Sequence, residues 1–159
     1  MTEAATQAQL FPTPQEQLTS DDYYTPAWIF DALGLRFDLD VASPPHATNV
    51  PCDRYYTQAD NGLAQPWYGR VWMNPPFSKP RPWVERWLDH ANGVALLPIS
   101  RAARWIDKLW DSPAKVYVIN KNIKFHRPDG STNHVWVCLW LWAIGDDNIE
   151  ALQNIGRVR

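Results

Sequence analysis

The 159-residue chain contains only two cysteines, Cys52 and Cys138. Their spacing fits neither a disulfide framework nor a metal-binding cluster, so we expect both to be small buried hydrophobic residues. No run of roughly 18 apolar residues occurs, which argues against a membrane-spanning helix. The first ten residues lack the basic and apolar regions of a signal peptide, which predicts a cytoplasmic protein.

Familiar patterns for metal binding and nucleophilic catalysis are missing as well. The four histidines lack the spacing of metal ligands; they are His46, His90, His126 and His134. No Ser-His-Asp or Cys-His arrangement is suggested by the sequence. We therefore expect neither a bound metal nor a covalent enzyme intermediate.

The net charge of −2 conceals an uneven distribution along the chain. Residues 1–69 carry 2 Lys or Arg and 9 Asp or Glu, a net of −7. Residues 70–130 carry 11 and 5, a net of +6, and residues 131–159 carry 2 and 3. A basic segment of this kind fits a surface that faces phosphates, although basic helix faces are often merely solvated.

With 45% hydrophobic and 20% charged residues, the chain has the composition of one globular domain. Residues 1–20 show no apolar period and are predicted to form a disordered tail. The folded domain is expected over 21–145 and a C-terminal tail over 146–159. Residues 44–69 are rich in Pro, Asn, Asp and Gly, which predicts a long irregular stretch.

Helical and strand patterns alternate from Thr25 onward. Helices are predicted at 26–33, with Thr25 as the N-cap, at 80–92 and at 101–110, where Trp105, Ile106, Leu109 and Trp110 would face inward. Strands are predicted at 36–43, 69–73, 93–100, 114–125 and 134–144. This order predicts an α/β domain with a mostly parallel sheet and an antiparallel C-terminal hairpin.

The segment Val-Trp-Met-Asn-Pro-Pro-Phe, residues 71–77, interrupts this pattern in an unusual way. An apolar strand runs into Asn74, and the two prolines that follow cannot continue a sheet ladder. The segment is either a proline-terminated strand or a rigid site for hydrogen-bond acceptors. The acidic stretch Asp-Leu-Asp-Val-Ala-Ser, residues 38–43, ends another strand. Ligands bind at the carboxyl ends of strands in open α/β sheets, so both segments are candidates for one site.

Asn-Pro-Pro-Phe resembles the (D/N/S)-P-P-(Y/F/W) motif of the exocyclic-amino DNA methyltransferases. The order of a Thr-Pro helix start, an acidic strand end and this motif is similar to the phage-type DNA N6-adenine methyltransferase (Dam-like) family, over residues 22–143. The resemblance implies a compact Rossmann-like methyltransferase fold, with S-adenosylmethionine as the methyl donor. It also implies methylation of adenine N6 in DNA, inside a bacterial or phage-infected host cell.

The same resemblance implies roles in catalysis. Asn74 and Pro75 match the pair that holds the target amine, because an amide oxygen and a backbone carbonyl accept its two hydrogens. Pro76 completes the motif, and Phe77 matches the residue that stacks on the extruded base.

Five further residues match positions that bind the cofactor. Thr25 and Pro26 match the Thr-Pro element beside the carboxylate of S-adenosylmethionine. Asp40 and Ala42 match the strand end that meets the methionine moiety. Asp60 is placed like the residue that accepts the adenine amino group.

The chain also departs from the family pattern. It has no F-x-G-x-G loop, and Val41 and Ser43 stand where Pro or Gly and Cys or Gly are usual. No acid is clearly placed for the ribose of the cofactor, although Asp38 and Asp53 are candidates. The missing glycine loop leaves open a catalytically silent member that binds DNA or a nucleotide. A cytosine-N4 methyltransferase also stays open, because the same acceptor pair could hold that amine.

Nothing in the sequence resembles a separate target-recognition domain. Basic residues around the proline motif and the predicted hairpin are candidates for phosphate contacts; they are Lys79, Arg81, Lys121, Lys124 and Arg127. The sequence thus predicts DNA as the partner and leaves the oligomeric state undetermined.

Overall fold

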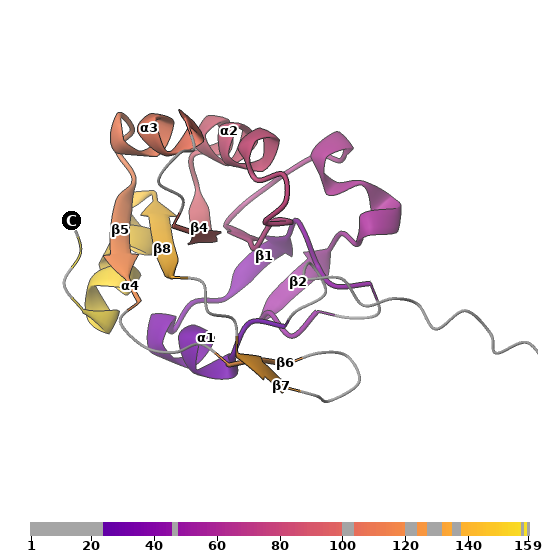
Figure 1. The fold of residues 1–159 in the computed structure, drawn as a ribbon, viewed down its shortest axis with the longest axis horizontal. Coiled ribbons are helices and arrows are strands. Elements are labelled where there is room, and N and C mark those ends of the chain that lie inside the picture. Colours follow the sequence, from indigo (N-terminus) through magenta and orange to yellow (C-terminus); the bar gives the residue numbers. More distant parts are fainter. Residues whose placement is uncertain are drawn as a thin grey trace, which may run out of the picture.

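A mixed six-stranded sheet lies at the centre of the part of the chain that this computed structural model describes (Figure 1). The described residues are 24–45, 48–99, 104–119, 138–156 and 158, with the backbone of strands β6 (Lys124–His126) and β7 (Thr132–His134). Across the sheet the strands are β2 (Cys52–Tyr55), β1 (Phe37–Asp40), β3 (Val71–Met73), β4 (Gly93–Pro98), β8 (Leu139–Ile144) and β5 (Lys115–Val118). The first four pair in parallel, whereas β8 runs antiparallel to both β4 and β5. The predicted α/β class is confirmed.

Within the described residues, two helices cover each face of the sheet (Figure 1). Helices α1 (Ala27–Leu33) and α4 (Asp146–Ile155) contact each other on one face. Helices α2 (Arg81–His90) and α3 (Arg104–Trp110) contact each other on the opposite face. Two short 3-10 turns, η1 (Gln58–Asp60) and η2 (Gly62–Ala64), follow β2. No described helix is long and apolar enough to span a bilayer.

Side-chain alternation in the strands divides the core into two layers, as the pleat of a strand requires. In β3, Trp72 packs with α1 and α4, whereas Val71 and Met73 pack with α2 and α3. Trp72 also meets two phenylalanine rings edge to face, with centroids 4.8 Å from Phe30 and 5.6 Å from Phe37. Every residue of β4 is buried, which is typical of a central strand covered on both faces.

Helix α1 begins one residue later than predicted. Pro26, and not Thr25, is its N-cap residue, with φ −58° and ψ 137°. The hydroxyl of Thr25 therefore does not cap the helix. Gly34 ends the helix as predicted, because its φ of 62° lies in the left-handed region that suits glycine.

The segment 44–69, predicted to be irregular, contains β2 and the two 3-10 turns. Strand β2 lies at the edge of the sheet beside β1, where most of its side chains are exposed. Without a buried face, the strand shows no apolar alternation in the sequence. The expectation that both cysteines are buried was also wrong, because Cys52 is half-buried and Cys138 is exposed.

The C-terminal segment 146–159, predicted to be a tail, contains helix α4. Asn148, Ala151 and Leu152 are buried at the spacing of one helix face. Helix α4 packs against β5, β8 and α1, so it belongs to the folded domain. Helix α3 also differs from the prediction, since Trp110 is 52% exposed, although its ring meets those of Trp140 and Trp142 edge to face.

The two C-terminal strand segments pair antiparallel, as predicted, but they divide between two sheets. Strands β5 and β8 pair within the main sheet, and β6 pairs with β7 in a separate two-stranded sheet. Strand β8 lies between β4 and β5, so β5 forms the edge of the main sheet.

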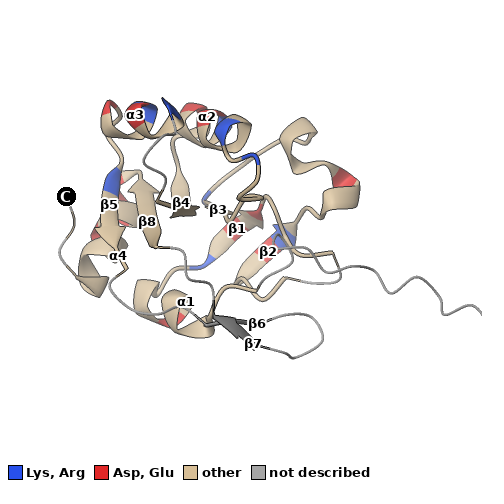
Figure 2. Cartoon of the chain, viewed as in Figure 1, with Lys and Arg blue, Asp and Glu red and all other residues tan. Residues whose placement is uncertain are grey.

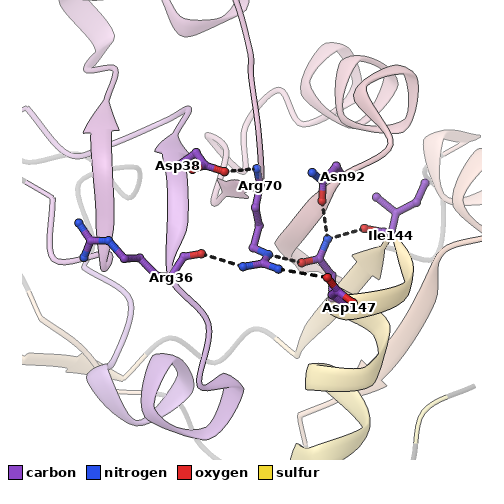
Figure 3. Close-up of polar contacts among 7 residues, drawn as sticks. Arg36, Asp38, Arg70, Asn92, Ile144 and Asp147 are labelled. Carbon is purple, nitrogen blue, oxygen red and sulfur yellow. Dashed lines mark hydrogen bonds and ion pairs between the residues drawn. The ribbon is translucent and has the colours of Figure 1, made fainter.

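A polar network joins α4 to the start of β3 at the amino ends of the parallel strands (Figure 3). Arg70 donates to Oδ1 of Asn148 over 2.7 Å and to the carbonyl of Arg36 over 3.1 Å. Asn148 donates to Oδ1 of Asn92 and to the carbonyl of Ile144, both over 2.8 Å. Asn148 is 1% exposed, so its amide depends on these partners.

We predict that Asn148→Ala lowers the free energy of unfolding by about 1–3 kcal/mol, because it leaves buried partners without a hydrogen bond. Urea unfolding measures the change. Asp147→Asn is the matched control: its carboxylate is 85% exposed and 3.9 Å from Arg70, so stability should change little. Equal losses in both variants would contradict a specific role for the buried amide.

Candidate active site

The carboxyl ends of β1 and β3 meet at one edge of the sheet, as the sequence predicted. The two strands pair in parallel with Asp40 opposite Trp72. Strands β2 and β3 flank β1 on opposite sides, so the chain changes its direction of progress across the sheet here. Such a switch point leaves a crevice outside the strand ends, where ligands bind in open α/β sheets.

A cavity of ≈ 250 Å³ lies at this crevice. The loop after β1 contributes Ala42 and Ser43 to its wall, and the loop after β2 contributes Gln58 and Asn61. The remaining wall comes from the proline motif and the start of α2, through Asn74, Pro76 and Trp83. The cavity therefore brings the acidic strand end and the Asn-Pro-Pro-Phe segment together.

Asn74 is held by a contact with a residue 49 positions earlier. Its Nδ2 atom donates to Oγ1 of Thr25 over 3.3 Å. Thr25 is 2% exposed, and its carbonyl accepts a hydrogen bond of 2.6 Å from Nδ2 of Asn49. The predicted cofactor residue Thr25 and the predicted catalytic residue Asn74 are thus direct partners.

The other residues of the proline motif lie close to Asn74. Pro75 is buried, whereas Pro76 and Phe77 are half-buried. Phe77 packs against the apolar cluster that includes helices α1 and α4. Pro26 is buried at the start of α1, beside Thr25.

Asp40 is a buried carboxylate with two hydrogen-bond donors. Its Oδ1 accepts from the backbone N–H of Ala42 over 3.2 Å, and its Oδ2 accepts from Oγ1 of Thr48 over 2.6 Å. Burial raises the pKa of Asp40 from 3.8 to about 6, although both hydrogen bonds oppose the rise. Burial and the charge of Asp40 likewise raise the pKa of the Cys52 thiol to about 11, so that thiol is neutral.

Asp60 closes the turn that borders the cavity. Its Oδ2 accepts from the N–H of Thr57 over 2.8 Å and from the hydroxyl of Thr57 over 2.9 Å, which forms a capping box. These bonds lower the pKa of Asp60. Among the described residues, Thr57, Gln58 and Asn61 line the cavity and Asp60 does not.

The loop after β2 is fastened to α2. The guanidinium of Arg86 donates to the carbonyls of Leu63 and Gln65, and the indole N–H of Trp67 donates to the carbonyl of Gly62 over 2.8 Å. A Cβ atom at Gly62 would lie 2.1 Å from the carbonyl oxygen of Val41, so only glycine allows this close approach.

The two acids considered for the cofactor's ribose have other partners. Asp38 accepts from the backbone N–H of Arg70 over 2.7 Å, at the opposite end of the strand from the cavity. Asp53 pairs with Arg36 at the surface. Neither is among the described residues that line the cavity.

Two of the predicted DNA-binding residues lie next to the proline motif. Lys79 and Arg81 are exposed, and Figure 2 shows basic residues in the loop before α2 and at its start. Arg81 donates to Glu85 over 3.0 Å. Lys121 and Arg127 lie outside the described residues, and only the backbone of Lys124, in β6, is described. The described residues hold no cluster of three His, Cys, Asp or Glu that could bind a metal ion.

Sequence reasoning missed several residues that build the site. Thr48 and Asn49 hold Asp40 and Thr25, and Gln58, Asn61 and Trp83 line the cavity. Four of these residues lie in the Pro- and Asn-rich stretch, whose composition predicts only a loop. Trp83 lies at helical spacing, which predicts only a core residue.

Comparison with known proteins gives a consistent family. The family model described as DNA N-6-adenine-methyltransferase (Dam) matches residues 13–136. A DNA N-6-adenine-methyltransferase of Haemophilus phage HP1 (strain HP1c1) is 33% identical over 116 residues, which cover 66% of this chain and 66% of that relative. A protein of the same name from Escherichia phage T1 is 30% identical over 95 residues, covering 55% of this chain and 39% of that relative.

No solved structure matches the chain. The family match nevertheless spans most of the sequence, and it includes the strand end at Asp40 and the proline motif at Asn74. The chain belongs to the DNA N-6-adenine-methyltransferase (Dam) family.

Proposed function

We propose that this protein transfers a methyl group from S-adenosylmethionine to the N6 amino group of adenine in DNA. The observation that carries the proposal is the place of Asn74, in the cavity wall at the carboxyl end of β3. The family match and the names of both phage relatives support adenine as the target base. We also infer that the fold is a Rossmann-like methyltransferase fold, because parallel strands with helices on both faces change direction beside this cavity.

The residues around the cavity fit S-adenosylmethionine, which supplies an electrophilic methyl group when bound. Asp40 is not among the described residues that line the cavity, but it lies two positions before Ala42, which does. A cationic partner, such as the ammonium group of the methionine moiety, would stabilise the negative charge of this buried carboxylate. Ala42 is small enough to leave room beside it. Trp83 and Gly62 offer a flat wall for the adenine ring of the cofactor, with Asp60 close by in the same turn.

Asn74 and Pro75 would activate the target amine. Adenine N6 is a poor nucleophile, because its lone pair is delocalised into the ring. The Asn74 side-chain oxygen and the Pro75 carbonyl would accept its two hydrogens, which localises the lone pair on nitrogen. Fixed dipoles would also stabilise the positive charge that develops on the amine.

Phe77 would stack on the target base and keep the amine aligned for in-line transfer. The base must leave the DNA helix to reach the cavity, at a cost of a few kcal/mol for unstacking. Two prolines after Asn74 limit backbone motion, so the acceptors are held in place before the base arrives.

We predict that the wild-type protein converts adenine in plasmid DNA to N6-methyladenine, and that Asn74→Ala reduces the rate at least about a hundredfold, the loss typical of a transition-state hydrogen bond. The variant should still bind S-adenosylhomocysteine with near-normal affinity, because Asn74 contacts the amine. The methylation rate is measured with tritiated cofactor and nucleoside mass analysis. The affinity for S-adenosylhomocysteine is measured by calorimetry.

Asn154→Ala is the matched control, because Asn154 is exposed on α4 and is not among the described residues that line the cavity. Recovery of N4-methylcytosine alone would favour the cytosine enzyme. Cofactor binding without any modified base would favour a silent DNA- or nucleotide-binding member.

We predict an unusual pH dependence from Asp40. Its native pKa of about 6 exceeds its unfolded value of 3.8, so the native state binds more protons between these values. The Asp40 contribution to stability should therefore fall by about 3 kcal/mol as the pH rises from about 4 to about 6, then stay constant. Urea unfolding of the cofactor-free wild type and of Asp40→Asn at several pH values isolates this contribution.

A cationic ligand favours the ionised carboxylate, so wild-type affinity for S-adenosylhomocysteine should decrease as the pH falls below about 6. Asp40→Asn should lack both trends. Parallel pH profiles for the two proteins would contradict the assigned role.

We propose that the basic residues near the proline motif and the C-terminal strands position DNA through its phosphates; they are Lys79, Arg81, Lys121, Lys124 and Arg127. Replacing Lys79 with Glu should weaken DNA binding, and it should lower the slope of log K against log salt by about one. Lys115→Glu is the control, because the exposed Lys115 begins β5, an edge strand that does not adjoin the strand before the proline motif. Equal salt slopes for Lys79→Glu and the wild type would place the DNA elsewhere.

A further inference from the structure

We propose that Thr25 is a positioning residue that fixes the orientation of the Asn74 amide. The inference rests on the proposed function and concerns the same site. It assigns the Thr25 hydroxyl to the catalytic amide, whereas family resemblance places this residue beside the carboxylate of the cofactor.

The amide of Asn74 has two orientations of similar shape and opposite function. In one, the oxygen faces the target amine and accepts its hydrogen. In the other, an N–H group faces the N–H of the amine, and the two donors repel. The proposed reaction therefore needs Asn74 to be held with its nitrogen away from the target amine.

Thr25 contacts the nitrogen side of the amide. Its Oγ1 lies 3.3 Å from Nδ2 of Asn74 and accepts a hydrogen from it, which leaves Oδ1 of the amide for the substrate. Thr25 is 2% exposed, so water competes little for the hydroxyl. Among the described residues, Asn74 lines the cavity and Thr25 does not. The hydroxyl thus reaches the amide from within the protein.

The position of Thr25 is itself constrained. Asn49 donates to the Thr25 carbonyl over 2.6 Å, and the next residue, Pro26, has its φ fixed by the ring. Helix α1 takes Pro26 as its N-cap residue, so the Thr25 hydroxyl is not used to cap the helix. The neighbouring Thr48 binds Asp40 over 2.6 Å, which links the same loop to the acidic strand end.

The two assignments of Thr25 predict different kinetic defects. If the hydroxyl binds the cofactor carboxylate, its removal should weaken cofactor affinity first. If the hydroxyl orients Asn74, its removal should lower the turnover number and leave cofactor affinity intact. The isosteric Thr25→Val substitution separates them, because it removes the hydroxyl and keeps the shape.

We expect Thr25→Val to lower kcat for adenine methylation about tenfold, the effect of one lost hydrogen bond. The dissociation constant of S-adenosylhomocysteine, measured by calorimetry, should stay within about twofold of the wild-type value, well below that loss. Thr25→Ser should restore most of kcat, because it returns an acceptor oxygen. Circular dichroism and thermal melting check the fold, and Thr25→Ala replaces the valine variant if the latter does not fold.

Ser112→Ala is the control, because it removes a half-buried hydroxyl that donates to the carbonyl of Leu109 at the end of α3, and Ser112 is not among the described residues that line the cavity. An equal loss of kcat in this control would overturn the assignment, as would a Thr25→Val variant that loses cofactor affinity first or keeps full turnover. A wild-type protein that methylates no adenine would refute the proposed function and this inference together. Adenine methylation with an unaffected Thr25→Val variant would refute the inference alone.

Discussion

The parallel pairing of β1 with β3 is the contact on which the candidate active site depends. It sets Asp40 opposite Trp72, so strands β1 and β3 end on the same side of the sheet. A shift of one residue would turn Trp72 away from Phe30 and Phe37, whose rings it meets edge to face. The apolar core beneath α1 therefore fixes the register, and the register places Asn74 beside the loop after Asp40. Pro75 and Pro76 then end the strand, which keeps the Asn74 side chain available to a substrate.

The parts of this arrangement that follow from short-range pattern could be predicted from the sequence. The apolar runs of β3 and β4 and the stop at Gly34 have local physical causes. Strand β2 could not be predicted, because an edge strand with exposed side chains has no apolar face to reveal it. Helix α4 was missed because its buried stripe is short and includes the polar Asn148, which is tolerated only through its partners in the folded network.

The contacts that organise the site join residues far apart in the sequence. Thr25 meets Asn74 across 49 positions, and Asn49 meets Thr25 across 24. No local spacing carries such information, since it depends on which loops the sheet brings to one edge. Family resemblance supplied the residue types at this edge and not their partners. It gave no indication that the Thr25 hydroxyl binds an amide, or that Asp60 uses one carboxylate oxygen to close its own turn.

Helix α2 connects the parts of the site that we propose to act on the base with those that border the proposed cofactor. It begins seven residues after Asn74, at Arg81, and its Val84 and Trp87 are buried in the core. From the same helix, Trp83 lines the cavity, and Arg86 holds the carbonyls of the loop after β2. A rigid helix anchored in this way cannot move one wall of the cavity without moving the other. If Lys79 and the start of α2 hold DNA phosphates, as we propose, one element sets the position of the flipped base relative to the methyl donor.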